Sequence, residues 1–187
     1  MLFYRLLSHS LLLVILAISV YAAEVHTPLG ERDRTLLVDL YQRGRGESAL
    51  ARRGLQQSQD PLIRDYALRL ERDHTELDQR IVALAGRHQL PLPSEIPTEI
   101  ATSLDELQKL HGARFDQTFM RRALAEHRAT IGHLEDAVQH THHDKVLEIA
   151  RIALARGREH LALAQRYDLS TTPETPGLVR TVPGGDR

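Results

Sequence analysis

Four segments of the chain repeat apolar or small residues at alternating spacings of three and four, which is the pattern of one buried helix face. Asp60 and Pro61 mark the start of the second segment, as an N-cap followed by proline at the first helical position. Because each apolar face must be buried against another element, the pattern predicts an all-α helix bundle. The expected long helices cover residues 33 to 58, 60 to 88, 113 to 141 and 144 to 168.

The connection between the second and third long helices is much longer than the other two. Residues 89 to 102 contain three prolines that exclude a continuous helix: Pro91, Pro93 and Pro97. Ser103 and Glu106 then fit a capping box, so we expect a short extra helix from Ser103 to about His111. Two short turns and one long crossover predict a ferritin-like four-helix bundle.

The composition agrees with this fold and excludes several classes of function. The 187 residues suit one domain, and aromatic residues, which strands favour, make up only 4% of them. The formal charge is -1, from 24 basic and 25 acidic residues, so no overall positive field attracts a nucleic acid. Cysteine is absent, which excludes disulfides and thiolate metal ligands. The 11 histidines are the unusual part of the composition.

The two ends of the chain differ from the expected bundle, residues 33 to 168. Residues 1 to 23 have the parts of an export signal, with Arg5 before an apolar run over residues 11 to 20. The run is shorter than the ~20 residues that cross a bilayer, so we expect cleavage and export to the periplasm rather than a retained anchor. We expect no membrane span in the mature chain, and a disordered tail over residues 169 to 187.

Each expected long helix carries one polar residue within its apolar face. Counted from the turns at ~1.5 Å per residue, the four lie at similar heights in the bundle. One carboxylate and three imidazoles suit a single divalent metal ion, either Zn, Cu, Fe or Mn. Asp73 or Asp116 would then orient an imidazole by accepting its other N–H. The four predicted ligands are Glu47, His74, His127 and His160.

A metal-free interpretation of the same residues is also open. In it, the histidines and Glu47 form a buried hydrogen-bonded network that Asp73 and Asp116 complete. The histidines of the turn before the last helix are interpreted as solvent-facing rather than as a second metal site. They are His140, His142 and His143.

The chain lacks the full motif of a di-iron ferroxidase, which needs Glu-x-x-His on two helices. Only Glu71 and His74 form such a pair, and Leu124 and Gly157 stand where the other histidines would need a Glu. We therefore do not expect iron storage or ferroxidase chemistry.

Several short motifs occur in a fixed order between Asp33 and Tyr167. They are Asp60-Pro61-x-Ile63-Arg64-x-x-Ala67, Asp73-His74, Leu-Pro-Leu-Pro at 90 to 93, Leu110-x-Gly112-x-x-Phe115-Asp116, His127, and Leu154 with His160-Leu161. This set resembles the bacterial ferritin-like family known as domain of unknown function 4142, and Glu47 matches the Glu of that family's first helix. The resemblance implies a ferritin-like fold and export to the periplasm or outer membrane. It implies no particular activity.

Three functions remain open at this point. The first is a non-enzymatic metal-binding or stress-protective role that uses the Glu/His layer. The second is a mononuclear metal oxidoreductase with the same ligands and an open coordination position. The third is an interaction scaffold for an unidentified protein partner, in which the polar layer only fixes the register of the helices. Metal content distinguishes the first two from the third, and the oligomeric state is left open.

Overall fold

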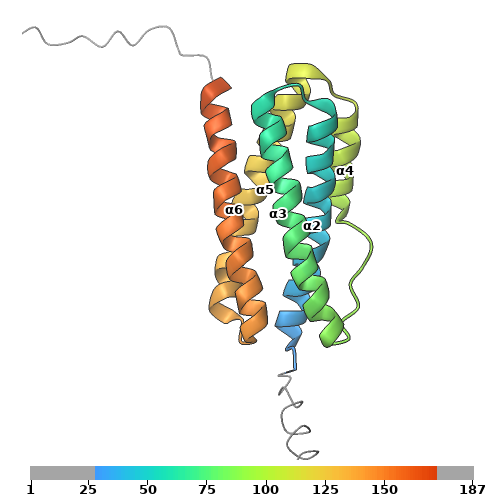
Figure 1. Cartoon of the computed structure of the whole chain (residues 1–187), viewed down its shortest axis with the longest axis vertical. Helices are drawn as coiled ribbons and strands as arrows, with labels where there is room; N and C mark the ends of the chain where they lie inside the picture. Colours follow the sequence, from blue (N-terminus) through green and yellow to red (C-terminus); the bar gives the residue numbers. More distant parts are fainter. Residues whose placement is uncertain (1–27, 172–187) are drawn as a thin grey trace, which may run out of the picture.

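The computed structural model describes residues 28 to 171, which form five helices and no β-strand (Figure 1). The four long helices begin and end within three residues of the expected positions, so the all-α prediction is confirmed. They are α2 (Glu31–Gln57), α3 (Pro61–Arg87), α5 (Gly112–His140) and α6 (Asp144–Thr171), and the short helix is α4 (Thr98–Gln108).

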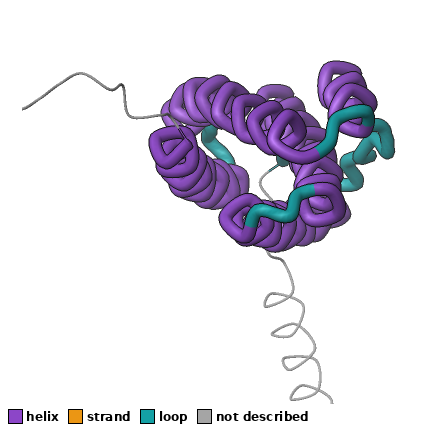
Figure 2. The backbone as a smooth tube through the Cα atoms, turned by 90° about the horizontal axis from the view of Figure 1, so that it is seen from above, coloured by secondary structure: helices purple, strands orange, loops and turns teal. Residues whose placement is uncertain are grey.

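The long helices form two antiparallel hairpins, α2 with α3 and α5 with α6. The crossover after α3 climbs back along the bundle, so α3 and α5 run in the same direction (Figure 1). Seen from above, the four long helices surround one core and α4 lies outside them (Figure 2). This is the predicted four-helix bundle with a long crossover.

A side-chain cap and a proline define the end of the turn between α2 and α3. The Asp60 side chain accepts a hydrogen bond of 2.8 Å from the backbone N–H of Leu62, and Pro61 is the first helical residue. The cap pairs one of the backbone donors that a helix N-terminus leaves unpaired. The predicted start of this helix is therefore confirmed.

The expected start of the short helix was wrong. α4 begins at Thr98, directly after Pro97, and Ser103 lies inside it, where its hydroxyl donates to the Glu99 carbonyl at 2.8 Å. The capping-box pattern gave the wrong start because nothing after Pro97 prevents a helix. The helix therefore begins five residues before Ser103. The helix buries Ile100 and Leu107, which are seven residues apart and therefore lie on the same face of it.

A glycine on α2 lets α4 approach closely. A Cβ atom at Gly46 would stand 2.7 Å from Cδ1 of Ile100. The crossover therefore packs against the α2 backbone itself, and α4 also contacts α5.

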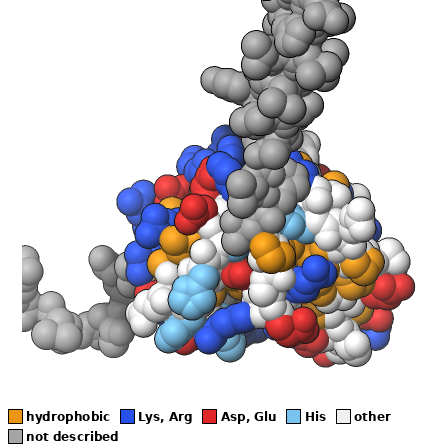
Figure 3. Space-filling view, turned by 90° about the horizontal axis from the view of Figure 1, so that it is seen from below, with side chains coloured by type: hydrophobic (Ala, Val, Ile, Leu, Met, Phe, Trp, Pro, Cys, Tyr) orange, Lys and Arg blue, Asp and Glu red, His pale blue; other side chains and the backbone are white. Residues whose placement is uncertain are grey.

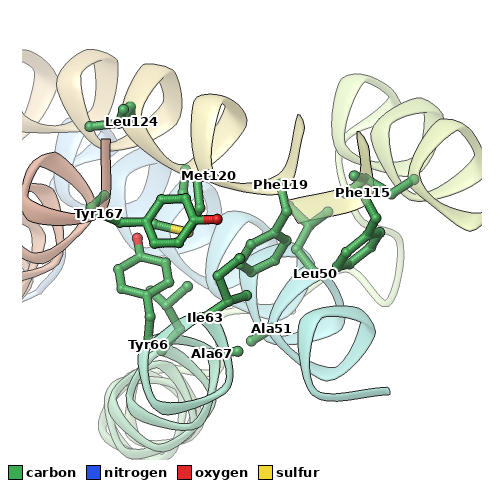
Figure 4. Close-up of a cluster of buried hydrophobic side chains, with 14 of the residues drawn as sticks. Leu50, Ala51, Ile63, Tyr66, Ala67, Phe115, Phe119, Met120, Leu124 and Tyr167 are labelled. Atoms are coloured by element: carbon green, nitrogen blue, oxygen red, sulfur yellow. The ribbon is translucent and has the colours of Figure 1, made fainter. Parts of the chain in front are cut away.

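The core consists of two apolar clusters, one toward each end of the bundle. The first includes Leu50, Tyr66, Phe119 and Tyr167, whose side chains point toward one another from α2, α3, α5 and α6 (Figure 4). The second includes Leu37, Leu40, Leu77, Ile81, Leu134 and Val146. On every long helix the residues between the two clusters include the polar position predicted from the sequence.

Both ends of the chain lie outside the described residues. These are the expected export signal and residues 172 to 187 of the expected tail, whereas residues 169 to 171 continue α6. Across residues 28 to 171, none of the helices combines the length and the apolar character that a membrane crossing requires.

Candidate metal centre

Three histidines from three helices meet between the two apolar clusters. His74 comes from α3, His127 from α5 and His160 from α6, and one ring nitrogen of each lies within 4.8 Å of the others. The exposed fractions of His127 and His160 are 4% and 1%. His74 is half-buried, but both of its ring nitrogens are shielded from solvent. Among the described residues this is the group of side chains whose donor atoms are close enough to share an ion.

Hydrogen bonds fix which ring nitrogens carry the protons. Nδ1 of His127 lies 2.8 Å from the carbonyl oxygen of Ala123, which only accepts, so this nitrogen is protonated. Nε2 of His160 lies 3.0 Å from Oδ2 of Asp73. Burial opposes the ionisation of Asp73, but hydrogen bonds from His160 and Arg72 keep its pKa below the usual value. As a carboxylate it only accepts, so Nε2 of His160 is protonated.

The remaining nitrogens of these two rings face each other. Nε2 of His127 lies 3.2 Å from Nδ1 of His160. With the other nitrogens protonated, both neutral rings direct a lone pair at the same space. Such an arrangement repels unless a proton or a cation lies between the two atoms. Two nitrogens bound tetrahedrally to one ion at about 2.0–2.1 Å are about 3.3 Å apart, close to the distance observed.

The third histidine has no hydrogen-bond partner. Both ring nitrogens of His74 are buried and unpartnered. Burial, followed by repulsion from His127 and His160, lowers the pKa of His74 to about 3. Burial likewise lowers the pKa of His127 to about 4. It also lowers the pKa of His160, although the hydrogen bond and the charge of Asp73 act to raise it. All three rings are therefore neutral near pH 7, the form in which imidazole binds a metal.

Glu47, the predicted fourth ligand, lies beside the histidines but not within their group. Its side chain is 5% exposed and its Oε1 has no hydrogen-bond partner. It lines a cavity of about 50 Å³ together with the three histidines, Asp73 and Gly44. Burial, and then the negative charge of Glu126, raises the pKa of Glu47 to about 8.

The structure places the two predicted orienting carboxylates very differently. Asp73 touches His160 directly, as described above. Asp116 lies 11 residues before His127 on α5, about 16 Å along the helix axis. Its charge acts instead on Tyr167, toward the end of the bundle that holds the first apolar cluster.

The small residues beside the polar positions divide into two groups. Gly44, Ala153 and Gly157 line the histidine cavity, as a bound ion would require. Gly54 instead makes room for packing, because a Cβ atom there would stand 2.9 Å from Phe119 and 3.1 Å from Ala67.

His side chains are exposed on the lower face of the bundle (Figure 3), but among the described residues they do not bring their donor atoms together as the three buried histidines do. Nδ1 of His140 lies 2.9 Å from the carbonyl oxygen of Asp136 in its own helix, and His142 is exposed. His143 is buried rather than solvent-facing, and its ring packs edge-on against His88 at 5.2 Å between centroids. The solvent-facing interpretation is therefore wrong for His143. It is buried because it lies in the short turn between α5 and α6, directly before α6 begins.

Glu71, of the single Glu-x-x-His pair, is not among the residues whose donor atoms come together at the site. Its carboxylate lies 3.5 Å from the guanidinium of Arg52. The pair therefore does not supply two adjacent ligands.

Two acidic residues near the site were not identified from the sequence. Glu126 shares the histidine cavity and pairs with Arg43 at 2.9 Å. Asp78 lies one turn after His74 on α3, and its Oδ1 is buried without a partner. Burial raises the pKa of Asp78 to about 7. The spacing of four from His74 to Asp78, opposite a glycine on α2, is the signal that would have identified it.

Comparisons with known proteins agree with the fold. A family model described as "Domain of unknown function (DUF4142)" matches residues 20–167. The crystal structure of a DUF305 fragment from Deinococcus radiodurans is similar with a TM-score of 0.68. At 18% sequence identity, with 75% of this chain and 97% of that chain covered, this likeness shows the fold alone. No curated protein matches the chain.

Proposed function

The chain belongs to the DUF4142 family, and we propose that it binds a single divalent transition-metal ion through His74, His127 and His160. One observation carries the proposal. The lone pairs of His127 and His160 face each other across 3.2 Å, with the opposite nitrogens committed to Ala123 and Asp73. A cation between them removes the repulsion and gives the unpartnered His74 a bond.

The metal-free network explains these contacts less well. It would require either His127 or His160 to carry two protons, although burial lowers the pKa of both rings. It would also leave both nitrogens of His74 without a partner, which costs about 1–3 kcal/mol for a buried polar group. A bound ion accounts for both features at once.

The donor set favours certain ions. Three neutral imidazoles without a thiolate suit Zn(II), Cu(II) or Fe(II) better than Mg or Ca. Glu47 shares the cavity and would supply a carboxylate near the remaining coordination position. Affinities are expected to follow the general order for nitrogen sites, with Cu(II) above Zn(II) and Zn(II) above Mn(II).

The proposed role is to hold the ion rather than to transform a substrate. The histidines are buried between two apolar clusters, which supports sequestration of a metal ion in a stress-protective role. We place this role in the periplasm because of the sequence of residues 1 to 23. N-terminal sequencing of the exported protein should then begin near Ala23 or Glu24.

Elemental analysis tests the proposal directly. The protein is purified from the periplasm without a histidine tag, and we expect about one equivalent of a single transition metal. The variant His127→Ala, purified in parallel, should contain none. Wild-type protein that stays metal-free after incubation with Zn(II) or Cu(II) would leave only the scaffold interpretation.

A second candidate function, metal-dependent redox chemistry, is favoured by a larger cavity beside the site. This cavity of about 210 Å³ lies between α2, α3, α4 and α5 and is lined mainly by apolar side chains. Glu47 and Glu126 line both cavities, so a small molecule there would approach the ion past Glu47. Peroxide or oxygen consumption by protein loaded with copper or iron tests this function, with His74→Leu as the inactive control.

A further inference from the structure

Two buried polar atoms without hydrogen-bond partners lie beside Gly44 of α2. They are Oδ1 of Asp78 and Nδ1 of His74, both on α3 and one helical turn apart. A Cβ atom at residue 44 would stand 2.6 Å from the first and 3.7 Å from the second. Glycine at this position therefore leaves the space in which the carboxylate and the imidazole face α2.

We propose that Asp78 is the positioning residue of His74: it accepts the Nδ1–H of His74 and so presents Nε2 to the metal ion. This inference rests on the metal site proposed above. Residues four apart on a helix lie on the same face, so a small rotation of the Asp78 side chain brings its oxygen to the ring. The hydrogen bond fixes both the tautomer and the orientation of the imidazole.

The other two histidines already show this arrangement. His127 donates from Nδ1 to the Ala123 carbonyl, and His160 donates from Nε2 to Asp73. In each ring the nitrogen that does not face the centre is held by an acceptor. Asp78 supplies the acceptor that His74 lacks, so every ligand has a partner that orients it.

The proposed role also accounts for a carboxylate at this position. A buried carboxylate oxygen without a partner destabilises a folded protein, and Leu at this position would avoid that cost. Asp78 also lines an outer groove with Arg45 and Ser48, and Arg45 is the cation whose charge favours its ionised form. Oδ1 of Asp78 has no hydrogen-bond partner and is therefore available to His74.

The test compares Asp78→Leu and Asp78→Asn with Asp65→Asn, which removes an exposed carboxylate from the same helix. Zn(II) affinity of the full-length protein is measured by competition with a chelator. Asp78→Leu should weaken binding by about 10- to 100-fold. Asp78→Asn should weaken it less, because the amide oxygen still accepts, and Asp65→Asn should bind as the wild type does.

Two further measurements distinguish positioning from packing. Metal-free Asp78→Leu should be at least as stable as the wild type in urea, because an unpartnered buried oxygen is removed. Nitrogen-15 NMR of the Zn(II) protein should show His74 bound through Nε2 with Nδ1 protonated.

Unchanged affinity in Asp78→Leu, or binding through Nδ1, would overturn the role of Asp78 while leaving the metal site intact. A loss of affinity that only follows a loss of metal-free stability would also overturn it. A wild-type protein that binds no Zn(II) would refute the metal site itself.

Discussion

At the residue scale, the three histidines of the site differ in how many hydrogen-bond partners their ring nitrogens have. The ring nitrogens of His160 and of His127 each make two contacts, whereas those of His74 make none. The three histidines should therefore respond differently to substitution, even though all three are proposed ligands.

His74→Leu and His160→Leu should both abolish stoichiometric metal binding but change metal-free stability in opposite directions. His74→Leu removes two unpartnered nitrogens, so the free energy of unfolding should rise by about 1 kcal/mol. His160→Leu strips Asp73 of its buried partner and should lower it by about 1–3 kcal/mol. Urea unfolding with EDTA present measures both values. Equal losses in the two variants would contradict this picture of the site.

Glu47→Gln should change how metal-free stability depends on pH. The pKa of Glu47 is raised from 4.5 to about 8 in the folded chain, so within this window the folded state keeps a proton that the unfolded state has lost. This group therefore makes unfolding easier as pH rises, by at most about 1.4 kcal/mol per unit. The variant lacks this slope, so its stability relative to wild type should increase steadily between pH 4.5 and about 8.

The histidines make the free energy of unfolding depend on pH in the opposite direction. Because variant and wild type both contain them, this contribution cancels when the two proteins are compared. Their folded pKa values lie below the ordinary 6.5, so their contribution is complete above that pH and is lost below it. A constant difference between Glu47→Gln and wild type would mean that Glu47 is ionised in the folded protein.

At the element scale, glycines permit close contacts that a repeat of apolar residues does not reveal. Gly46 admits Ile100 of α4, and Gly54 admits Phe119 of α5 and Ala67 of α3. These contacts hold the crossover and the two hairpins together around the first apolar cluster. Gly46 and Gly54 thus serve the packing of the helices rather than the space around the proposed ion.

Gly54→Ala and Gly132→Ala should therefore have opposite effects on stability. Alanine is favoured over glycine inside a helix by about 1 kcal/mol. At Gly132, where a Cβ atom meets nothing within 4 Å, this gain should appear in full. At Gly54 the new methyl group meets Phe119 at 2.9 Å, and overpacking should outweigh the gain, for a net loss of about 1–2 kcal/mol. Thermal unfolding of the two variants measures the contrast, and stabilisation by both would contradict the packing described.

At the scale of the whole molecule, the proposed ion links the two hairpins. His74 belongs to the first hairpin, and His127 and His160 belong to the second. Metal binding should consequently stabilise the entire bundle rather than one helix.

Addition of Zn(II) at about 100 times its dissociation constant should stabilise the fold by about 2.7 kcal/mol. For a domain of this size the melting temperature should rise by roughly 5–10 °C, and EDTA should reverse the rise. His74→Leu should show no shift under the same conditions. A shift of equal size in that variant would indicate binding at another place, such as the turn that contains His142.

Local signals in the sequence were enough to predict the four long helices and the topology of the bundle. Helical periodicity, the Asp60-Pro61 cap and the prolines of the crossover are local signals, and local hydrogen bonding and chain stiffness decide where helices begin and end. The height of His74, His127 and His160 was also predictable, because helix length fixes position along the axis once the turns are known.

How the side chains meet around that height depends on the packing of the four helices against one another. Rotation of each helix and choice of rotamer bring Asp73 to His160 and leave Glu47 outside the group of the three histidines. Burial, which depends on all neighbouring helices, shifts the pKa values of Glu47 and the histidines. The position of Asp78 beside Gly44 likewise depends on how closely α2 and α3 pack, a distance that no pattern along one helix contains.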